Sequence, residues 1–337
     1  MRPTYLVGAA LCVAVVAISS SGPLIAYAAA PALAIAFWRN GIAATLLAPV
    51  AGVRRRDELR HLASPAGRGV LLGCALAGLF LAAHFASWVS SVKMTDVADA
   101  TALGATQPVW QGLIARGQGR RLARTTWIGI GIAVAGAFAA TTADVAVSGR
   151  AVEGDLLALV GALAVAVYTA FGERVRAETS TLGYTTVCYG TCAAVLLAVC
   201  LVFRVDLVGY PGTTWLAIGG IVAGAQLLGH SMFSYALSRV PATTIAVLIL
   251  LEVPGAALIA WLWLGQVPGA GSAPGLALLV LGVLVVVLGG RRAAAVPDAL
   301  PRQAEEGGAA EAEVPASAEA PPAEAVPGLD HMFEADG

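Results

Sequence analysis

The feature that most constrains this chain is a series of long apolar stretches that are nearly free of charge. A helix needs about 20 such residues to cross the hydrocarbon core of a membrane. Ten stretches qualify, at residues 4–28, 31–51, 67–91, 95–115, 122–141, 155–176, 183–204, 213–237, 241–264 and 272–290. Only 12% of all residues are charged, too few to cover so large an apolar surface in water. We therefore predict an all-α integral membrane protein with ten transmembrane helices.

The basic residues predict how these helices are oriented. With ten spans, sixteen arginines lie in the segments on the same side as the N-terminus or close to them. The opposite loops carry only Lys93, Arg150 and Arg204, and Arg39 lies inside the second span. Because loops rich in Lys and Arg stay in the cytoplasm, we expect a multi-pass protein of the cell (plasma) membrane with both termini cytoplasmic.

The C-terminal segment, residues 293–337, differs from the rest of the chain. It holds ten acidic residues and one arginine, is rich in Ala, Pro and Glu, and has few large apolar side chains. Such a composition cannot bury enough apolar surface to fold. We predict a disordered acidic tail that solvates the chain, with docking of a partner as the alternative.

An internal repeat relates the two halves of the membrane region. A shift of 146 residues aligns the third to fifth spans with the eighth to tenth without a gap, and it matches His84 with His230 and Pro108 with Pro254. Five glycines also match, namely Gly73, Gly78, Gly119, Gly129 and Gly136 with Gly219, Gly224, Gly265, Gly275 and Gly282. A repeat of five spans must be inverted in the membrane, and inverted repeats around a midplane site are typical of secondary transporters.

Several segments carry a family resemblance. They are SSSGPLIAY at 19–27, LAIAFWRN at 33–40, HFASWVSSVKMTDVADATALGATQPVW at 84–110, GDLLALVGALAVAVY at 154–168 and LLEVPGAALIAWLWLGQVP at 250–268. The sequence resembles the drug/metabolite transporter superfamily, specifically chains with two EamA-type repeats. The resemblance implies a ten-helix secondary carrier of metabolites, amino acids or toxic compounds, often an exporter. The repeats are expected at 4–141 and 155–290.

Two ionisable residues inside spans are candidates for a transport role, because charge in a membrane is costly and commonly functional. Glu252 lies near the middle of the ninth span, where a carboxyl group could couple transport to protons or bind a cationic substrate. A structural hydrogen bond beside Pro254 is its alternative. Arg39 could hold a carboxylate or phosphate in a bidentate manner. It could equally tie helices together, through a backbone carbonyl or through Glu252.

Histidines and amides supply the other candidates. His84 and Trp88 share a helix face, as do Gln226 and His230, and the two histidines could line one pathway. A packing role is the alternative for each histidine. In the fourth span, Gln107, Trp110 and Gln111 form a face with the amides and aromatic wall of a small-solute cavity. A packed helix interface is the alternative for that face.

Several kinds of chemistry lack their motifs in this sequence. There is no G-x-x-x-x-G-K-[ST] phosphate loop and no H-E-x-x-H zinc motif, and the single lysine, Lys93, lies in a predicted loop. We therefore expect no enzyme activity, cofactor or metal, and no nucleic-acid partner.

The combined features predict a secondary transporter that works by alternating access, in which a central cavity opens first to one side of the membrane and then to the other. We expect the first to fourth and sixth to ninth spans to line a central cavity, and the fifth and tenth to brace the bundle or a homodimer. The predicted activity is proton-coupled export of a small metabolite, amino acid or drug. The alternative is a non-transporting structural or sensory membrane subunit that acts through its C-terminal tail.

Overall fold

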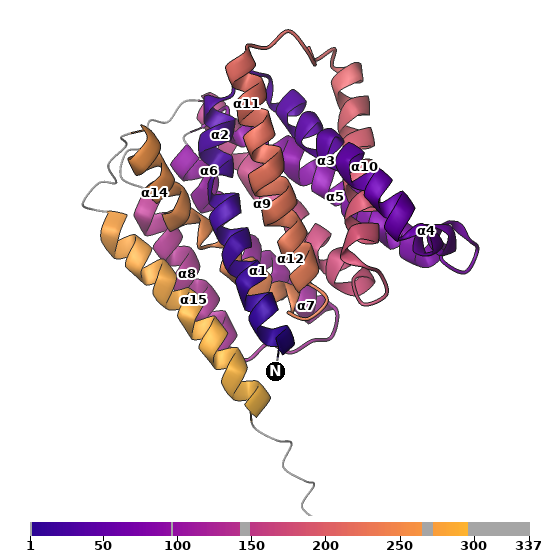
Figure 1. The fold of residues 1–337 in the computed structure, drawn as a ribbon. Helices are drawn as coiled ribbons and strands as arrows, with labels where there is room; N and C mark the ends of the chain where they lie inside the picture. The colour runs from indigo at the N-terminus through magenta and orange to yellow at the C-terminus, as the bar shows by residue number, and fades with distance from the viewer. Residues whose placement is uncertain (1, 96, 142–148, 265–271, 296–337) are drawn as a thin grey trace, which may run out of the picture. The chain divides into compact units, whose positions relative to one another are not determined.

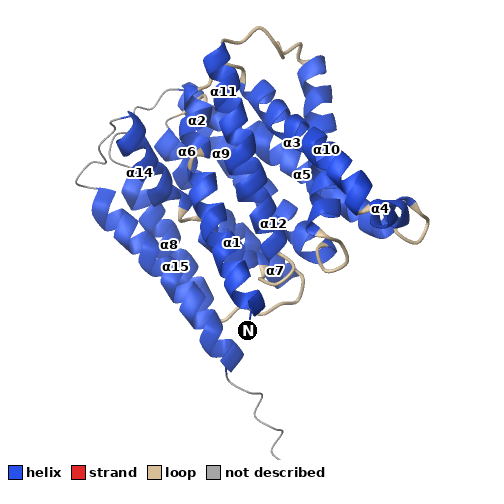
Figure 2. Cartoon of the chain, in the orientation of Figure 1, coloured by secondary structure: helices blue, strands red, loops and turns tan. Residues whose placement is uncertain are grey.

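The computed structural model describes residues 2–95, 97–141, 149–264 and 272–295, which form helices with no strand among them (Figures 1 and 2). In chain order these are α1 (Arg2–Ser19), α2 (Ser21–Tyr27), α3 (Ala32–Arg54), α4 (Arg56–Ala63), α5 (Arg68–Val92), α6 (Val97–Gly104), α7 (Gln107–Gly117), α8 (Arg124–Thr141), α9 (Gly149–Val175), α10 (Thr181–Val202), α11 (Gly212–Ile221), the π-helix η1 (Val222–His230), α12 (Ser231–Ala236), α13 (Ala242–Ile249), α14 (Glu252–Leu264) and α15 (Ser272–Ala295). The predicted acidic tail lies outside the described residues from Val296 onward.

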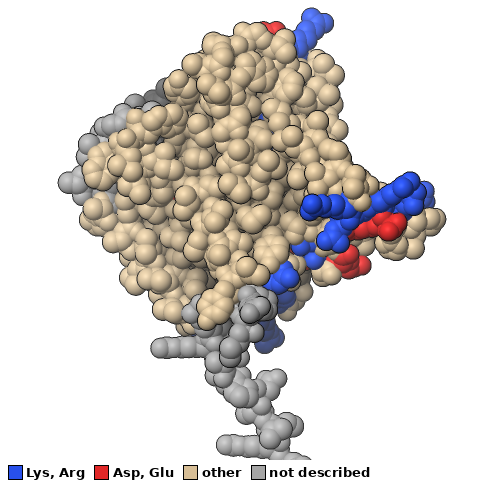
Figure 3. Space-filling view, in the orientation of Figure 1, with Lys and Arg blue, Asp and Glu red and all other residues tan. Residues whose placement is uncertain are grey.

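Seven helical stretches within the described residues are long and apolar enough to cross a membrane. They are Tyr5–Tyr27, Ala32–Arg54, Arg68–Val92, Gly149–Val175, Thr181–Val202, Gly212–Ala236 and Ala242–Trp263, and two shorter apolar helices cover Arg124–Ala139 and Ala273–Gly289. Figure 3 shows Lys and Arg side chains gathered over α4, while the surface beside them on this face is almost bare of charge. These features are those of a multi-pass membrane protein.

Prolines set where several helices begin. Pro31, Pro211 and Pro241 directly precede the first residues of α3, α11 and α13, with extended backbone at each proline. Proline lacks an N–H group, so it costs least where a helix has not yet formed its hydrogen bonds. Ser180 starts α10 differently, because its hydroxyl accepts a hydrogen bond of 3.0 Å from the Gly183 backbone N–H. The local sequence therefore determines where these four helices begin.

Four of the ten predicted spans are interrupted. The first span bends at Ser20, between α1 and α2, where the hydroxyl groups of Ser19 and Ser20 donate to the carbonyls of Val15 and Ala17. Hydroxyl bonds back to the preceding helical turn bend helices. The fourth and ninth spans break into α6–α7 and α13–α14, and the eighth contains η1. Periodicity and hydropathy alone do not reveal such interruptions, because both halves of each span stay apolar.

The interior divides into three hydrophobic clusters. The largest joins α3, α5, α9 and α10 and includes Phe85, Tyr184 and Leu196. A second joins α8 and α15 with α13, and a third joins α1 with α12 and α13. Extensive contact between α5 and α9 and between α3 and α10 places these helices side by side.

Helices α8 and α15 approach each other closely through glycines (Figure 1). A methyl group added at Gly129 would lie 2.9 Å from the Gly282 carbonyl oxygen, and one at Gly136 would lie 2.8 Å from the Gly275 carbonyl oxygen. Both distances are too short for a real side chain, so glycine is needed at this crossing. Small residues let helix backbones meet in this way inside membranes.

Candidate functional site

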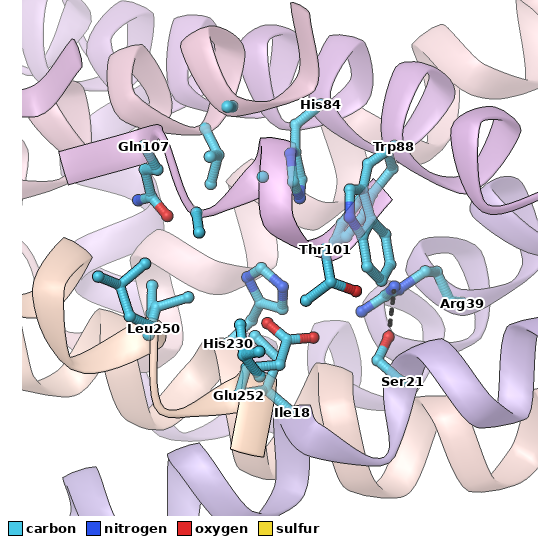
Figure 4. Close-up of a pocket in the computed structure, with 17 residues that line it drawn as sticks. Ile18, Ser21, Arg39, His84, Trp88, Thr101, Gln107, His230, Leu250 and Glu252 are labelled. Atoms are coloured by element: carbon cyan, nitrogen blue, oxygen red, sulfur yellow. Dashed lines mark hydrogen bonds between the residues drawn. The ribbon is translucent and has the colours of Figure 1, made fainter. Parts of the chain in front are cut away.

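A cavity lies where helices from both halves of the sequence meet (Figure 4). Its walls come from α1, α2, α3, α5, α6, α7, α9, η1, α13 and α14, and they include Arg39, His84, Trp88, Gln107, His230 and Glu252. Its volume of about 60 Å³ holds only a few water molecules. Six of the nine residues predicted to carry transport therefore lie around one narrow space.

Arg39 extends from α3 and is fully buried. Its Nε donates a 2.9 Å hydrogen bond to Gln226 Oε1, and its Nη1 donates a long 3.5 Å bond to Ser21 Oγ. The guanidinium carbon lies 3.9 Å from the centre of the Phe85 ring, a cation–π contact. Arg39 forms no ion pair with Glu252, although both line the cavity. A backbone carbonyl or Glu252 is the structural partner that the sequence suggests for Arg39, whereas the structure gives it the side chains of Gln226 and Ser21.

Two broken helices bring polar residues to the cavity at related positions. Helix α6 ends at Gly104 and α7 begins at Gln107, whereas α13 ends at Ile249 and α14 begins at Glu252. Pro108 and Pro254 explain both breaks, because neither proline has an N–H to donate to the carbonyl four residues earlier. The 146-residue shift superimposes the two prolines. Each break exposes the N-terminal end of a helix, which is positively polarised.

The two histidines face each other across the cavity. Their ring centres lie 6.4 Å apart, and Figure 4 shows both rings turned into the same space. His84 Nδ1 lies 2.9 Å from the Gly161 carbonyl oxygen. Because a carbonyl only accepts, this nitrogen carries a proton and His84 is anchored to α9. His230 has no hydrogen-bond partner that the structure records within the described ranges, so its ring is held by packing against Phe85 and Tyr168.

The sequence of this chain matches the model of a known protein family. The model of the EamA-like transporter family matches the sequence twice, over residues 4–142 and 152–288. The chain belongs to the EamA-like transporter family. The resemblance seen in the sequence is thereby confirmed, and membership indicates a membrane transporter.

One solved structure, titled only "Crystal structure of protein", shares the fold of this EamA-like protein. It aligns with a TM-score of 0.68 at 22% identity, covering 85% of this chain and 99% of the other. At 22% identity the similarity shows that the two proteins share a fold and nothing further. No curated protein matches the sequence.

Three predicted residues of the EamA-like chain lie outside the cavity lining. Gln226 stands behind Arg39 as its hydrogen-bond partner. Gln111 is buried and accepts a 2.7 Å hydrogen bond from Thr169 on α9, and Trp110 is half-buried. Gln111 thus contacts a neighbouring helix, as in the packed interface that was the alternative for this face. Of the three residues of this face, only Gln107, at the first position of α7, reaches the cavity.

The seventh span does not line the cavity, contrary to the prediction for it. None of the described residues of α10 is among the lining residues. Instead Tyr189 of α10 supports the wall from behind, through a 3.1 Å hydrogen bond with Ser231.

Sequence reasoning missed two features of this EamA-like site. Asn40 was not singled out, although it is fully buried beside Arg39 and bonds to Gln226. The helix breaks at Gly104 and Ile249 were also missed. The matched prolines were the signal for them, since proline near the start of a helix favours a new N-terminus.

Proposed function

We propose that this protein is a secondary transporter that exports a small metabolite, amino acid or drug in exchange for protons, by alternating access. The observation that carries the proposal is a cavity between two helix breaks at related positions, with a mainly apolar wall that also holds Arg39, His230 and Glu252. Discontinuous helices around a central site are typical of secondary transporters.

The proposed architecture is ten transmembrane segments in two inverted repeats, 4–141 and 155–290, with cytoplasmic termini. Helices α6 and α7 together form the fourth segment, and α8 and α15 form the fifth and tenth. The glycine contacts support inversion: Gly129 faces Gly282, and Gly136 faces Gly275. The 146-residue shift exchanges Gly129 with Gly275 and Gly136 with Gly282, so each contact is the symmetry mate of the other.

The size of the cavity supports movement of the halves. Pockets for small molecules usually measure roughly 300–1,000 Å³, and this cavity measures about 60 Å³. A solute of that size therefore does not fit in the cavity as it stands. A solute enters only when helices move apart on one side, and it leaves when they move apart on the other.

Glu252 is the proposed proton-binding group. Its side chain lines the cavity as the first residue of α14, and the Glu252 carboxylate in Figure 4 points into the space shared with His230. A proton arriving from outside neutralises the carboxylate and changes the charge that the solute meets. The ionised carboxylate attracts a cationic group of the solute, such as an ammonium, and the protonated form does not, so proton binding promotes release of a solute that carries such a group.

The test is solute flux in proteoliposomes with an imposed pH gradient, using a panel of amino acids and cationic dyes. We expect uphill movement of at least one solute together with collapse of the pH gradient. Downhill flux that leaves the gradient intact would contradict proton coupling, and absence of flux for every solute would contradict the assigned substrate classes.

A truncated chain ending at Ala295 distinguishes transport from the structural or sensory subunit. A transporter keeps its flux without residues 296–337, because the cavity and all described helices are retained. Loss of flux in a truncated protein with an unchanged thermal midpoint would favour a role for the tail.

A further inference from the structure

A directional chain of buried amides lies behind Arg39. Asn40 Nδ2 donates a 3.0 Å hydrogen bond to the Ala36 carbonyl oxygen, which fixes Asn40 Oδ1 as an acceptor. Gln226 Nε2 donates to that oxygen at 3.0 Å, so Gln226 Oε1 must face Arg39 Nε, at 2.9 Å. The carbonyl at one end therefore sets the orientation of both amides, because each group has only one donor end and one acceptor end.

The amide chain leaves one end of the guanidinium available. Gln226 holds Arg39 Nε, Ser21 holds Nη1, and Phe85 lies over one face of the group. The Nη2 nitrogen is buried and has no hydrogen-bond partner in the described part of the chain. An arginine is always charged, and leaving one of its donors buried and unpaired costs free energy. An acceptor that enters the cavity would satisfy this donor.

A second unpaired donor lines the same cavity. Gln107 Nε2 is buried without a partner among the described residues, and only 3% of the Gln107 side chain surface is exposed. Gln107 is also the first residue of α7, whose N-terminal end favours anions. Arg39 and Gln107 thus place unpaired donors at two separate points of the cavity wall (Figure 4). The charged donor, Arg39 Nη2, is the one that a carboxylate oxygen suits best.

The π-helix fixes the position of Gln226. The Ser231 backbone N–H donates to the Gln226 carbonyl five residues earlier, which is the π-helical pattern, and the Tyr189 hydroxyl reaches the same carbonyl at 3.5 Å. A glutamate at this position would neutralise Arg39, whereas glutamine orients the group and leaves its charge for the solute. Glutamine at this position therefore leaves Arg39 positively charged and able to bind a negatively charged group of the solute.

We propose that Asn40 and Gln226 are positioning residues that aim Arg39 Nη2 into the cavity, so that the site selects solutes with a carboxylate group. This proposal rests on the proposed transport function and names the charge class of its substrate. Arg39 binds the carboxylate, and the two amides act only through Arg39.

The test measures binding to the purified full-length protein, and it is independent of coupling. L-alanine, L-threonine and L-phenylalanine are each compared with their methyl esters, in which the carboxylate is capped and the ammonium is kept. Dissociation constants come from calorimetry. We expect the wild-type protein to bind at least one free amino acid about tenfold more tightly than its ester.

Two variants remove the positioning. Gln226→Glu should abolish the preference for the free acid, because the new carboxylate occupies Arg39. Asn40→Leu should reduce the preference several-fold, because Gln226 loses the contact that orients it. Thr185→Val is the control: Thr185 is a buried residue of α10 that bonds only to carbonyls of its own helix, and its removal should leave the ratio unchanged.

The outcomes separate this proposal from the transport function. Equal binding of acid and ester by the wild-type protein, or no binding of any probe, would overturn the carboxylate site. A preference that persists in both Gln226→Glu and Asn40→Leu would overturn the positioning role. If the ratios behave as expected but proteoliposomes show no flux, the site stands and the transport function fails.

Discussion

Helix α5 and the segment α11–η1–α12 occupy matched places in the two halves, yet they differ in backbone and chemistry. Each brings one histidine to the cavity, and the 146-residue shift superimposes His84 on His230. Helix α5 is continuous from Arg68 to Val92, whereas its counterpart contains the nine-residue η1. Gln226 in η1 corresponds to Phe80 in α5. The scaffold is therefore duplicated, while the polar group that orients Arg39 occurs only once.

The two broken helices teach the same lesson. Pro108 and Pro254 interrupt matched segments, and the residue two positions before each proline is Thr106 in one half and Glu252 in the other. The helix breaks and the close helix contacts thus occur in both repeats, whereas the charged residue at the break occurs in only one of them. Variants at matched positions can therefore separate scaffold from chemistry.

The largest expected effect is at Glu252. Glu252→Gln should abolish uphill transport driven by a pH gradient, because the amide cannot take up a proton, while the protein still folds. Thr106→Val is the matched variant and should retain most of the flux, since the Thr106 hydroxyl bonds only to the Leu103 carbonyl of its own turn. Proteoliposome flux measures both. Full pH-driven activity in Glu252→Gln would remove this residue from the coupling mechanism.

The second comparison sets His230 against His84. His84→Leu should lower the free energy of unfolding by about 1 kcal/mol, because it removes the hydrogen bond to Gly161. The thermal midpoint of the purified protein should fall accordingly. His230→Leu should leave stability nearly unchanged and reduce pH-driven flux, because this ring contacts the cavity without such an anchor. Flux and thermal midpoint are measured on each variant. Equal effects of the two substitutions on both quantities would show that the histidines are interchangeable.

Much of the architecture was predictable from sequence because hydropathy and the internal repeat are strong signals. The spans that contain Arg39 and His84 and the family were predicted correctly from residues 4–290, and both histidines line one cavity. The bend after Ser19 also has a local signal, namely three successive serines followed by Gly22 and Pro23.

The remaining parts depend on tertiary contacts that no local pattern encodes. The partner of Arg39 could not be chosen from sequence, since Glu252 and Gln226 lie in different spans and either could reach it. Asn40 bonds to Gln226 across 186 residues of chain. The π-helix leaves the apolar pattern of its span intact, so hydropathy does not report it. Which polar residues of a helix point into the cavity depends on how that helix packs against its neighbours.

The smallest effect on transport, and the clearest test of symmetry, is expected at the crossing of α8 and α15. Gly136→Ala and Gly282→Ala should each destabilise the protein by about 1–3 kcal/mol, because a methyl group would overlap the facing backbone. Gly131→Ala is the control on α8, since open space surrounds this position.

Thermal denaturation in detergent measures all three variants. The two matched glycines should give similar shifts, because each added methyl group meets backbone of the opposite helix: Gly136 faces the Gly275 carbonyl at 2.8 Å, and Gly282 faces Ala133 Cα at 2.7 Å. The control should be neutral or slightly stabilising, because alanine restricts the unfolded chain more than glycine does. A large loss in one matched variant and none in the other would mean that the contact is not shared equally between the halves. The duplicated scaffold would then be as asymmetric as the chemistry that it carries.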